Sequence, residues 1–290
     1  MPFDQLPERP PMHFPAADAY SDAVLARSRA AAALPGVRLS ADRAYGSHPD
    51  QRLDIYAPAG ERTGLPVLVF VHGGAWVGGY KEWAGFMAPA LLPQPAILVS
   101  VEYRLAPEHV YPAAVQDVAA ALKWVQQHIA EFGGDPGRIL LSGHSAGAHL
   151  ASLVALDPRW LAAEGLGVDC IRGVLPISGL YDLQYDTSDE RNRFAAAICA
   201  AFVPESADLP AASPLSHVSP RAAPFHITAG QHDLGNLASE AVTLCARLQA
   251  AGVPATINIL PGHDHFDAHA RCVDPGHVWL AYAREMLGRV

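Results

Sequence analysis

The sequence predicts an α/β fold built on one doubly wound, mostly parallel β-sheet with helices on both faces. Two observations support this fold class. Short apolar, β-branched runs alternate with longer amphipathic runs from about residue 50 to the C-terminus. The apolar runs also lack the polar alternation of half-exposed strands, which is typical of parallel strands covered on both sides. A chain of 290 residues suffices for one large core, so we expect a single domain over residues 1–290.

The expected strands are short apolar segments rich in residue types that pack well on a buried, pleated surface. They are Val67–Val71, Ala96–Val101, Ile139–Ser142, Val174–Ser178, Phe225–Ala229 and Thr256–Leu260. Because helical segments separate them, these strands are expected to lie parallel in one sheet.

The segments between the strands show helical periodicity. After Pro112, apolar residues recur at spacings of three and four as far as Ile129, which gives one apolar helix face. Proline is tolerated in the first turn of a helix, and Gly133–Gly134 is expected to end this one. Ala146–Leu156 and Leu237–Ala251 predict further crossover helices.

Two regions interrupt the alternation of strands and helices. Residues 1–45 form a Pro-rich arm followed by an Ala-rich helical stretch, and residues 183–218 carry charges, several prolines and one expected helix near Phe194–Phe202. Both are longer than ordinary connections between elements. We therefore expect them to form a lid over the ends of the strands.

The composition argues against several classes of function. Charged residues make up 17% of the chain, the formal net charge is −9, and no block of Lys or Arg suggests a nucleic-acid-binding face. No apolar run is long enough to span a membrane, and the N-terminal residues lack the pattern of a signal peptide. We expect a cytoplasmic protein with no nucleic-acid or membrane partner. The oligomeric state stays open, with a homo-oligomer as one alternative.

A G-x-S-x-G motif identifies Ser145 as the candidate nucleophile. Residues 143–147, GHSAG, follow the expected strand Ile139–Ser142 and open the expected helix Ala146–Leu156. A nucleophile elbow requires this strand–turn–helix setting. Side chains at the two glycine positions would collide with neighbouring elements in so sharp a turn. The alternative is a Gly-rich turn whose serine only caps the helix.

The loop 72–76, HGGAW, directly follows the expected strand Val67–Val71. Its small residues let backbone N–H groups approach an oxyanion closely, and it precedes the elbow by two strands, where hydrolases of this kind place the oxyanion loop. We assign the oxyanion hole to the N–H groups of Gly74, Ala75 and Ala146, with Gly73 as the reserve.

Three side chains near these loops are given separate roles. We expect His72 to shape the loop by hydrogen bonding rather than to transfer protons. Trp76 is expected either to line the substrate pocket or to belong to the core. Trp76 and His144 are our candidate substrate-binding side chains.

A serine nucleophile needs a base and an acid that orients the base. In folds with a nucleophile elbow, the acid and then the histidine follow the serine along the chain. Asp233 comes just past the strand Phe225–Ala229, at the carboxyl end of the sheet beside the elbow, and Asp182 is the alternative acid. Both His263 and His265 follow the last expected strand, and the residues alone leave the choice between them open.

Metal and cofactor binding have little support in the spacing of candidate ligands. An H-x-H pair such as residues 263–265 can ligate zinc, but no third ligand is evident. Neither C-x-x-C nor zinc spacing occurs among Cys170, Cys199, Cys245 and Cys272. We therefore expect no metal and no cofactor. A metal-dependent hydrolase using His263, His265 and His269 is one alternative class, and a non-catalytic binding module is another.

Several segments together resemble the α/β-hydrolase superfamily of serine esterases. The similarity is to the branch of the kynurenine formamidases (arylformamidases) and the hormone-sensitive-lipase-like carboxylesterases, and it covers about residues 50–290. It rests on residues 51–56 (QRLDIY), 72–76 (HGGAW), 103–108 (YRLAPE), 132–147 (FGGDPGRILLSGHSAG) and 177–183 (ISGLYDL). In this branch the catalytic histidine precedes a phenylalanine, which implies His265 before Phe266 as the base, with Asp233 as the acid.

The resemblance implies a serine hydrolase that cleaves carboxylic esters through an acyl-enzyme on Ser145. The alternative is an arylformamidase acting on N-formylkynurenine or a related aryl formamide. Ala75 and His144 stand where lipase-like relatives usually carry Gly and Asp, which favours the formamidase-like branch. We expect short acyl groups, because lid aromatics such as Phe194 and Phe202 would narrow the acyl side of the site. The partner is therefore a small-molecule ester or amide.

Overall fold

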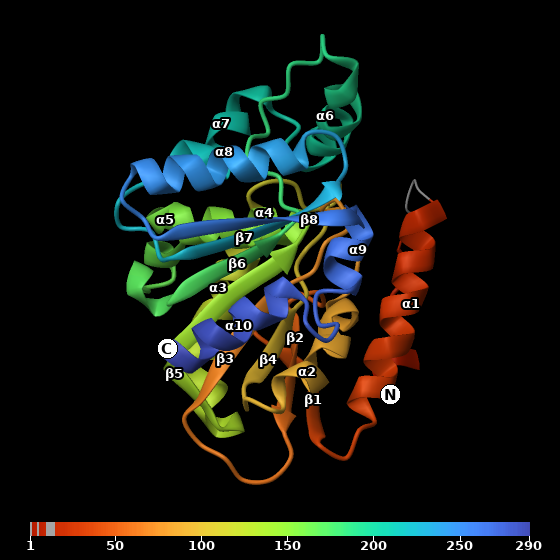
Figure 1. Ribbon diagram of the computed structural model, residues 1–290, viewed down its shortest axis with the longest axis vertical. Helices are drawn as coiled ribbons and strands as arrows, with labels where there is room; N and C mark the ends of the chain where they lie inside the picture. The colour runs from red at the N-terminus through yellow and green to blue at the C-terminus, as the bar shows by residue number, and fades with distance from the viewer. Residues whose placement is uncertain (1, 5, 10–14) are drawn as a thin grey trace.

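The computed structural model describes residues 2–4, 6–9 and 15–290, and within them one eight-stranded sheet forms the centre of the fold (Figure 1). Its strands are β1 (Val37–Ala44), β2 (Arg52–Pro58), β3 (Leu65–Val71), β4 (Ile97–Val101), β5 (Gly134–His144), β6 (Gly173–Ile177), β7 (Phe225–His232) and β8 (Ala255–Asp264). They lie in the order β1-β2-β4-β3-β5-β6-β7-β8. Only β2 runs antiparallel to its neighbours, β1 and β4, and the other described pairs are parallel. The predicted fold class is confirmed.

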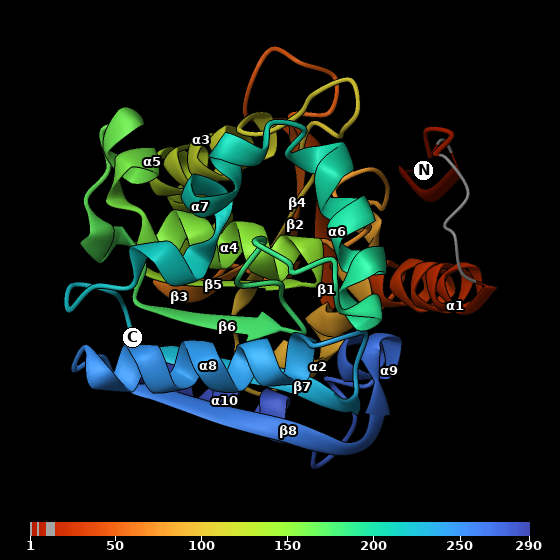
Figure 2. The same cartoon turned by 90° about the horizontal axis from the view of Figure 1, so that it is seen from above.

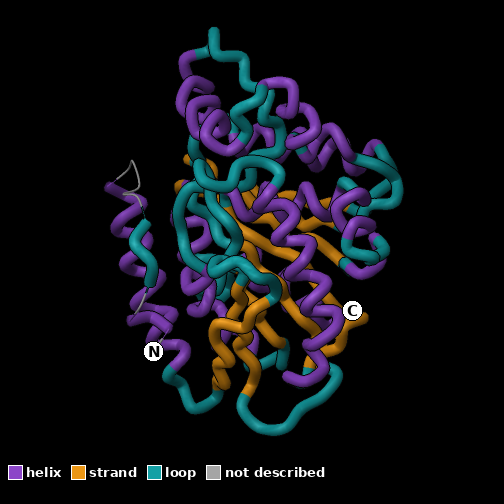
Figure 3. Tube along the Cα trace, turned by 180° about the vertical axis from the view of Figure 1, so that it is seen from behind, coloured by secondary structure: helices purple, strands orange, loops and turns teal. Residues whose placement is uncertain are grey.

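Helices cover both faces of this sheet, as Figures 1 and 3 show from opposite sides. The α-helices are α1 (Pro15–Ala32), α2 (Ala88–Leu91), α3 (Ala113–His128), α4 (Ala146–Leu156), α5 (Pro158–Ala163), α6 (Glu190–Phe202), α7 (Leu209–Ala212), α8 (Leu237–Ala250), α9 (His265–Ala270) and α10 (Val278–Arg289). The 3-10 helices are η1 (Pro2–Asp4), η2 (Lys81–Met87), η3 (Ile129–Phe132), η4 (Val168–Cys170), η5 (Ser206–Asp208) and η6 (Pro214–His217).

Alternation along the central strand β3 explains how one sheet builds two cores. Val67, Val69 and Val71 pack with α3, α4 and α8 on one face. Leu68 and Phe70 point to the opposite face and pack with α1, η2 and α10. Successive side chains of a strand point to opposite faces, so a continuous apolar run is needed where both faces are covered.

The N-terminal region differs from the expected lid. Residues 37–44 form the edge strand β1, paired antiparallel with β2, and α1 packs against η2 and α9 at the side of the sheet. The strand was missed because its sequence, VRLSADRA, is polar and half-exposed rather than continuously apolar. Polar side chains of this kind are common on edge strands, which would otherwise pair with other chains.

Residues 183–218, which we call the cap, contain α6, η5, α7 and η6. Figure 2 shows α6 and α7 on the side of the sheet that carries α3 and α4. The backbone N–H of Tyr111 donates to the carbonyl oxygen of Phe202 at 2.7 Å, and η6 contacts α4. The cap therefore packs on the helix that begins at the predicted nucleophile. The side chain of Phe194 lies outside the described residues.

Two further expectations concern membranes and thiols. Among the helices in the described ranges, none is long and apolar enough to cross a membrane. Each cysteine is a free thiol: Cys199, Cys245 and Cys272 are buried and Cys170 is half-buried.

Candidate active site

Ser145 lies in the tight turn between β5 and α4. Its backbone has φ 56° and ψ −123°, an unfavourable conformation for any residue with a Cβ. A Cβ at Gly143 would lie 2.5 Å from the backbone of Gly147, and one at Gly147 would lie 2.1 Å from the carbonyl oxygen of Val71. The two glycines therefore allow the turn to pack closely against β3. As the sequence predicted, side chains at these positions would collide with neighbouring elements.

The structure brings Ser145, His265 and Asp233 together in one hydrogen-bonded chain. His265 is the first residue of α9, and its Nε2 lies 2.9 Å from the Oγ of Ser145. Its Nδ1 lies 2.6 Å from the Oδ1 of Asp233, which follows β7. A nucleophile, a base within reach of its proton and an acid that orients the base are thus held in contact.

The two alternatives from the sequence lie elsewhere. The Oδ1 of Asp182 accepts the backbone N–H of Gln184 at 3.1 Å, and the Nδ1 of His263 lies 3.0 Å from the carbonyl oxygen of Pro261. Nor do three or more His, Cys, Asp or Glu side chains converge as a metal site anywhere in the described ranges. The metal-dependent alternative therefore finds no ligand set there.

Asp233 is held by three donors besides His265. The Ser178 hydroxyl and the N–H of Gly230 donate to Oδ2 at 2.5 and 3.0 Å, and the N–H of Leu234 donates to Oδ1 at 2.9 Å. Burial raises the pKa of Asp233, but the charge of His265 and these hydrogen bonds outweigh burial and hold the pKa below its usual value. The group is therefore a carboxylate at neutral pH. Sequence reasoning missed Ser178, although it follows β6 directly within the ISGLYDL segment.

The loop after β3 has an unusual backbone. Gly74, Ala75 and Trp76 all have positive φ, at 115°, 56° and 60°. The N–H groups of Val77 and Gly78 donate to the carbonyl oxygen of Gly74 at 3.1 and 2.9 Å, which closes a tight turn. Non-glycine residues in this conformation cost about 1–3 kcal/mol each, so the surrounding structure must stabilise the loop.

The predicted oxyanion donors lie next to the nucleophile. A Cβ built on Gly73 would be 3.1 Å from the Cβ of Ser145, so the loop passes directly beside it. Within the described chain, no internal hydrogen bond uses the N–H groups of Gly74 and Ala75. Ala146 is the first residue of α4, where an N–H has no partner within the helix and lies at the positive end of the helix dipole. All three N–H groups are free to donate to a ligand.

His72 stabilises this loop by hydrogen bonding, as the sequence predicted. Its Nδ1 lies 2.6 Å from the carbonyl oxygen of Gly73 and its Nε2 lies 2.7 Å from the Oε1 of Glu102. The ring stacks on Tyr103 with centroids 4.4 Å apart, and the Tyr103 hydroxyl donates to the carbonyl oxygen of His72 at 3.0 Å. Both ring nitrogens are thus occupied, which leaves none for proton transfer to a substrate.

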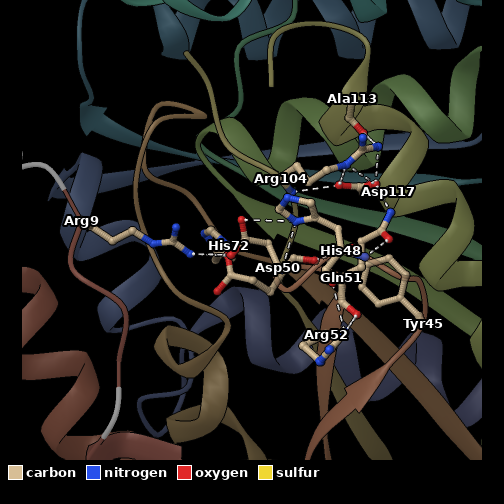
Figure 4. Close-up of polar contacts among 11 residues, drawn as sticks. Arg9, Tyr45, His48, Asp50, Gln51, Arg52, His72, Arg104, Ala113 and Asp117 are labelled. Carbon is tan, nitrogen blue, oxygen red and sulfur yellow. Dashed lines mark hydrogen bonds and ion pairs between the residues drawn. The ribbon is translucent and has the colours of Figure 1, made fainter. Parts of the chain in front are cut away.

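Glu102 connects this loop to the N-terminal arm. Figure 4 shows Arg9 of that arm pointing toward His72 and Asp50. The guanidinium of Arg9 lies 3.5 Å from Glu102 and 3.6 Å from Asp50. Burial raises the pKa of Glu102, but the charge and hydrogen bond of His72, together with Arg9, hold it below its usual value. Glu102 is therefore an ionised partner for His72. Sequence reasoning missed this pair because its members lie 30 residues apart, directly after two different strands, β3 and β4.

Trp76 and His144, our candidate substrate-binding side chains, are both buried, and for Trp76 this agrees with the alternative that it belongs to the core. Trp76 is 0% exposed and stacks on Phe202 with centroids 4.6 Å apart. His144 is 2% exposed, its Nε2 lies 2.9 Å from the carbonyl oxygen of His265, and its ring stacks on His269. Both side chains turn inward because these aromatic partners bury them. They support the loop and the base rather than line an open pocket.

Comparison with known proteins agrees with the fold. Residues 53–248 match the BD-FAE family. The chain is 34% identical to the esterase LipC of Mycobacterium tuberculosis over 76% of this chain and 58% of that protein. It is 32% identical to the probable isoprenylcysteine alpha-carbonyl methylesterase ICMEL1 of Arabidopsis thaliana over 77% of this chain and 50% of that protein. The chain thus spans about half the length of the curated relatives it matches.

A solved structure supports the fold over nearly the whole chain. The hyperthermophilic esterase from the archaeon Pyrobaculum calidifontis superposes with a TM-score of 0.77 at 24% identity, covering 94% of this chain and 92% of that one. Similar folds host many functions, so this likeness supports the α/β-hydrolase architecture alone.

Proposed function

The chain belongs to the BD-FAE family and has the α/β-hydrolase fold, and on that premise we propose that it is a serine hydrolase of carboxylic esters with short acyl groups. The observation that carries the proposal is the hydrogen-bonded chain from Ser145 through His265 to Asp233, beside backbone N–H groups that are free to donate. The names of the two relatives, an esterase and a methylesterase, support an ester as the substrate.

Acylation follows from the geometry. His265 Nε2 accepts the Ser145 proton while Oγ attacks the ester carbonyl carbon, and the Asp233 carboxylate stabilises the imidazolium that forms. The carbonyl oxygen becomes an oxyanion and accepts hydrogen bonds from the N–H groups of Gly74, Ala75 and Ala146. The tetrahedral intermediate then collapses, and His265 returns the proton to the departing alkoxide, which leaves as the alcohol.

Deacylation uses the same groups. His265 accepts a proton from water, the resulting nucleophile attacks the acyl-enzyme, and collapse releases the carboxylic acid and restores the Ser145 hydroxyl. Each group acts in both half-reactions, so loss of any one should depress the whole cycle.

The preference for short acyl groups is supported by the aromatic packing beside the oxyanion loop. Trp76 and Phe202 are both fully buried and stack with their planes 5° apart. Because Trp76 directly follows Ala75 in the oxyanion loop, we expect these packed rings to limit the room for a long acyl chain on that side. One methylene that fits or clashes in such a pocket changes rates by about ten- to two-hundred-fold.

A panel of substrates tests the proposal. We expect p-nitrophenyl acetate and butyrate to be cleaved far faster than the octanoate and decanoate, with activity retained in EDTA. Ser145→Ala should lose about 10³-fold or more in kcat and should not be labelled by phenylmethylsulfonyl fluoride. Full activity in that variant would reject Ser145 as the nucleophile. Rates that rise through the decanoate would reject the short-acyl preference, and cleavage of N-formylkynurenine in preference to all esters would support the arylformamidase alternative.

A further inference from the structure

His149 lies in the first turns of α4, four residues after Ser145, and contacts two other parts of the molecule. The indole Nε1–H of Trp76 donates to His149 Nδ1 at 3.2 Å, and His149 Nε2 lies 2.8 Å from the carbonyl oxygen of Ala212. The ring is 0% exposed. One buried imidazole thus joins the oxyanion loop to the cap through the helix that carries the nucleophile.

We propose that His149 is a positioning residue that holds the oxyanion loop in its active geometry and couples that loop to the cap. The inference rests on the proposed function, since it concerns the N–H groups assigned to the oxyanion. Nothing about His149 follows from the G-x-S-x-G motif, and its partners come from segments 63 and 73 residues away in the sequence.

The two hydrogen bonds determine the protonation of the ring. An indole N–H only donates, so Nδ1 must be the acceptor, and the carbonyl of Ala212 only accepts, so Nε2 must carry the hydrogen. This is the neutral Nε2–H tautomer. Burial lowers the pKa of His149 to about 4, which keeps the ring in this form at neutral pH.

The connection to the oxyanion donors runs through Trp76. This residue directly follows Ala75, and both have positive φ. The backbone of Trp76 is anchored because its carbonyl accepts the N–H of Ala106 at 2.9 Å, and its side chain is anchored by His149 and by stacking on Phe202. Fixing Trp76 at both points restricts rotation of the Ala75–Trp76 peptide. Because Ala75 joins this peptide to the Gly74–Ala75 peptide, the restriction also limits the direction in which the Ala75 N–H can point.

The cap supplies two of the contacts that fix this geometry. Phe202 ends α6 and stacks on Trp76, and Ala212 ends α7 and accepts from His149. A displacement of either cap element would therefore move the indole or remove its hydrogen-bonded support. The cap contributes to the oxyanion site without touching the oxyanion.

The test compares three variants. His149→Phe keeps an aromatic ring but removes both hydrogen bonds, and His149→Gln offers an amide acceptor and donor. Trp76→Phe removes the indole donor and leaves a smaller ring against Phe202. With active sites titrated, His149→Phe should lose about 10- to 100-fold in kcat with little change in KM, and His149→Gln should recover part of the loss. Trp76→Phe should show a smaller loss in kcat. The double variant His149→Phe/Trp76→Phe should lose less in kcat than the product of the two single fold-losses.

An inhibitor comparison separates positioning from simple destabilisation. A trifluoromethyl ketone forms an anionic hemiketal with a serine, so its affinity should fall by the same factor as kcat in His149→Phe, whereas the affinity of the matching methyl ketone should not. His226→Phe is the control, because His226 is also buried but lies away from the site. Its Nδ1 is 2.7 Å from the Oγ1 of Thr256. This variant should lower the thermal midpoint but leave kcat and the inhibitor ratio unchanged.

The outcomes for this inference and for the proposed function are distinct. If the wild-type protein cleaves no ester, the proposed function fails. If it cleaves esters and His149→Phe lowers only the thermal midpoint, with kcat per active site and ketone affinities unchanged, the inference about His149 is wrong and the proposed function stands. Should His149→Phe fail to fold, Trp76→Phe with the same inhibitor ratio decides the question.

Discussion

Two histidine–carboxylate pairs lie near Ser145, and they differ in what the second ring nitrogen contacts. His265 and Asp233 are joined at 2.6 Å, and His72 and Glu102 at 2.7 Å. In each pair the histidine holds the pKa of the carboxyl below its usual value against the effect of burial. The free nitrogen of His265 faces the Ser145 hydroxyl, whereas the other nitrogen of His72 is occupied by the carbonyl of Gly73.

The difference shows how one pair of residue types can serve two purposes. Where the second nitrogen faces a hydroxyl, the pair can take up and return a proton. Where it meets a backbone oxygen, the pair can only hold the backbone in place. The donors of the oxyanion loop must stay free for the substrate, so they cannot be fixed by hydrogen bonds of their own. Groups behind the loop, such as His72 and His149, have to position them instead.

The largest effect should come from breaking the pair that faces Ser145. His265→Ala removes the base, and we expect a loss of about 10³-fold or more in kcat, because members of a triad act as a unit. His263→Ala is the matched control, since the Nδ1 of His263 lies 3.0 Å from the carbonyl oxygen of Pro261 and its ring packs edge-on against His277. It should change kcat less than about threefold. Steady-state kinetics with p-nitrophenyl acetate measure both, and reversed severities would identify His263 as the base.

The second prediction concerns the loss of the other pair, His72 and Glu102. Glu102→Gln removes the charge opposite His72 and should lower kcat about 10- to 100-fold, because misplacing the loop by a fraction of an ångström weakens oxyanion stabilisation. Asp50→Asn is the control: Asp50 is the other carboxylate near Arg9, at 3.6 Å, and no contact joins it to His72. Equal losses in the two variants would show that anchoring of Arg9, rather than His72, is what matters.

The third prediction concerns the support of Asp233. Ser178→Ala removes one of three donors other than His265, so the pKa of Asp233 should rise and kcat should fall only about two- to tenfold. Ser142→Ala, which removes an equally buried hydroxyl bonded to the carbonyl of Leu175 at 2.6 Å, should not affect kcat. A loss as large as that of His265→Ala would mean that Ser178 orients Asp233 almost alone.

The smallest effect should appear in stability rather than in rate. Glu240 accepts the N–H groups of Tyr181 and Asp182 at 2.8 and 3.2 Å, and burial raises its pKa from 4.5 to about 7. Between these pH values the folded state keeps a proton that the unfolded state has released, so the free energy of unfolding should fall as pH rises. Glu240→Gln should remove this dependence and be more stable than wild type at pH 8, by on the order of 1–2 kcal/mol. Urea unfolding at pH 5 and pH 8 measures the free energy of unfolding of both proteins. An identical change between the two pH values in both would contradict the assignment of this pH dependence to Glu240.

The parts of the fold that were predictable depend on residues close together in the sequence. The strand Ile139–Ser142 was recognised from its apolar run, and the structure extends it to Gly134–His144. The turn at Ser145 was recognised because its two glycines are required by backbone contacts within the turn and with β3. The edge strand β1 was missed, since a half-exposed polar strand has no continuous apolar pattern.

The sequence by itself determined the alternation of strands and helices and the elbow around Ser145, because periodicity and turn sterics act between neighbouring residues. The resemblance implied His265 and Asp233, but only the tertiary structure placed His265 against that serine and Asp233 against His265. It also decided that Trp76 and His144 face inward and that Glu102, Ser178 and His149 support the site. The contacts concerned join residues 30 or more positions apart, such as His72 with Glu102 and Ser145 with His265, and no local pattern records which distant side chains a folded sheet will bring together.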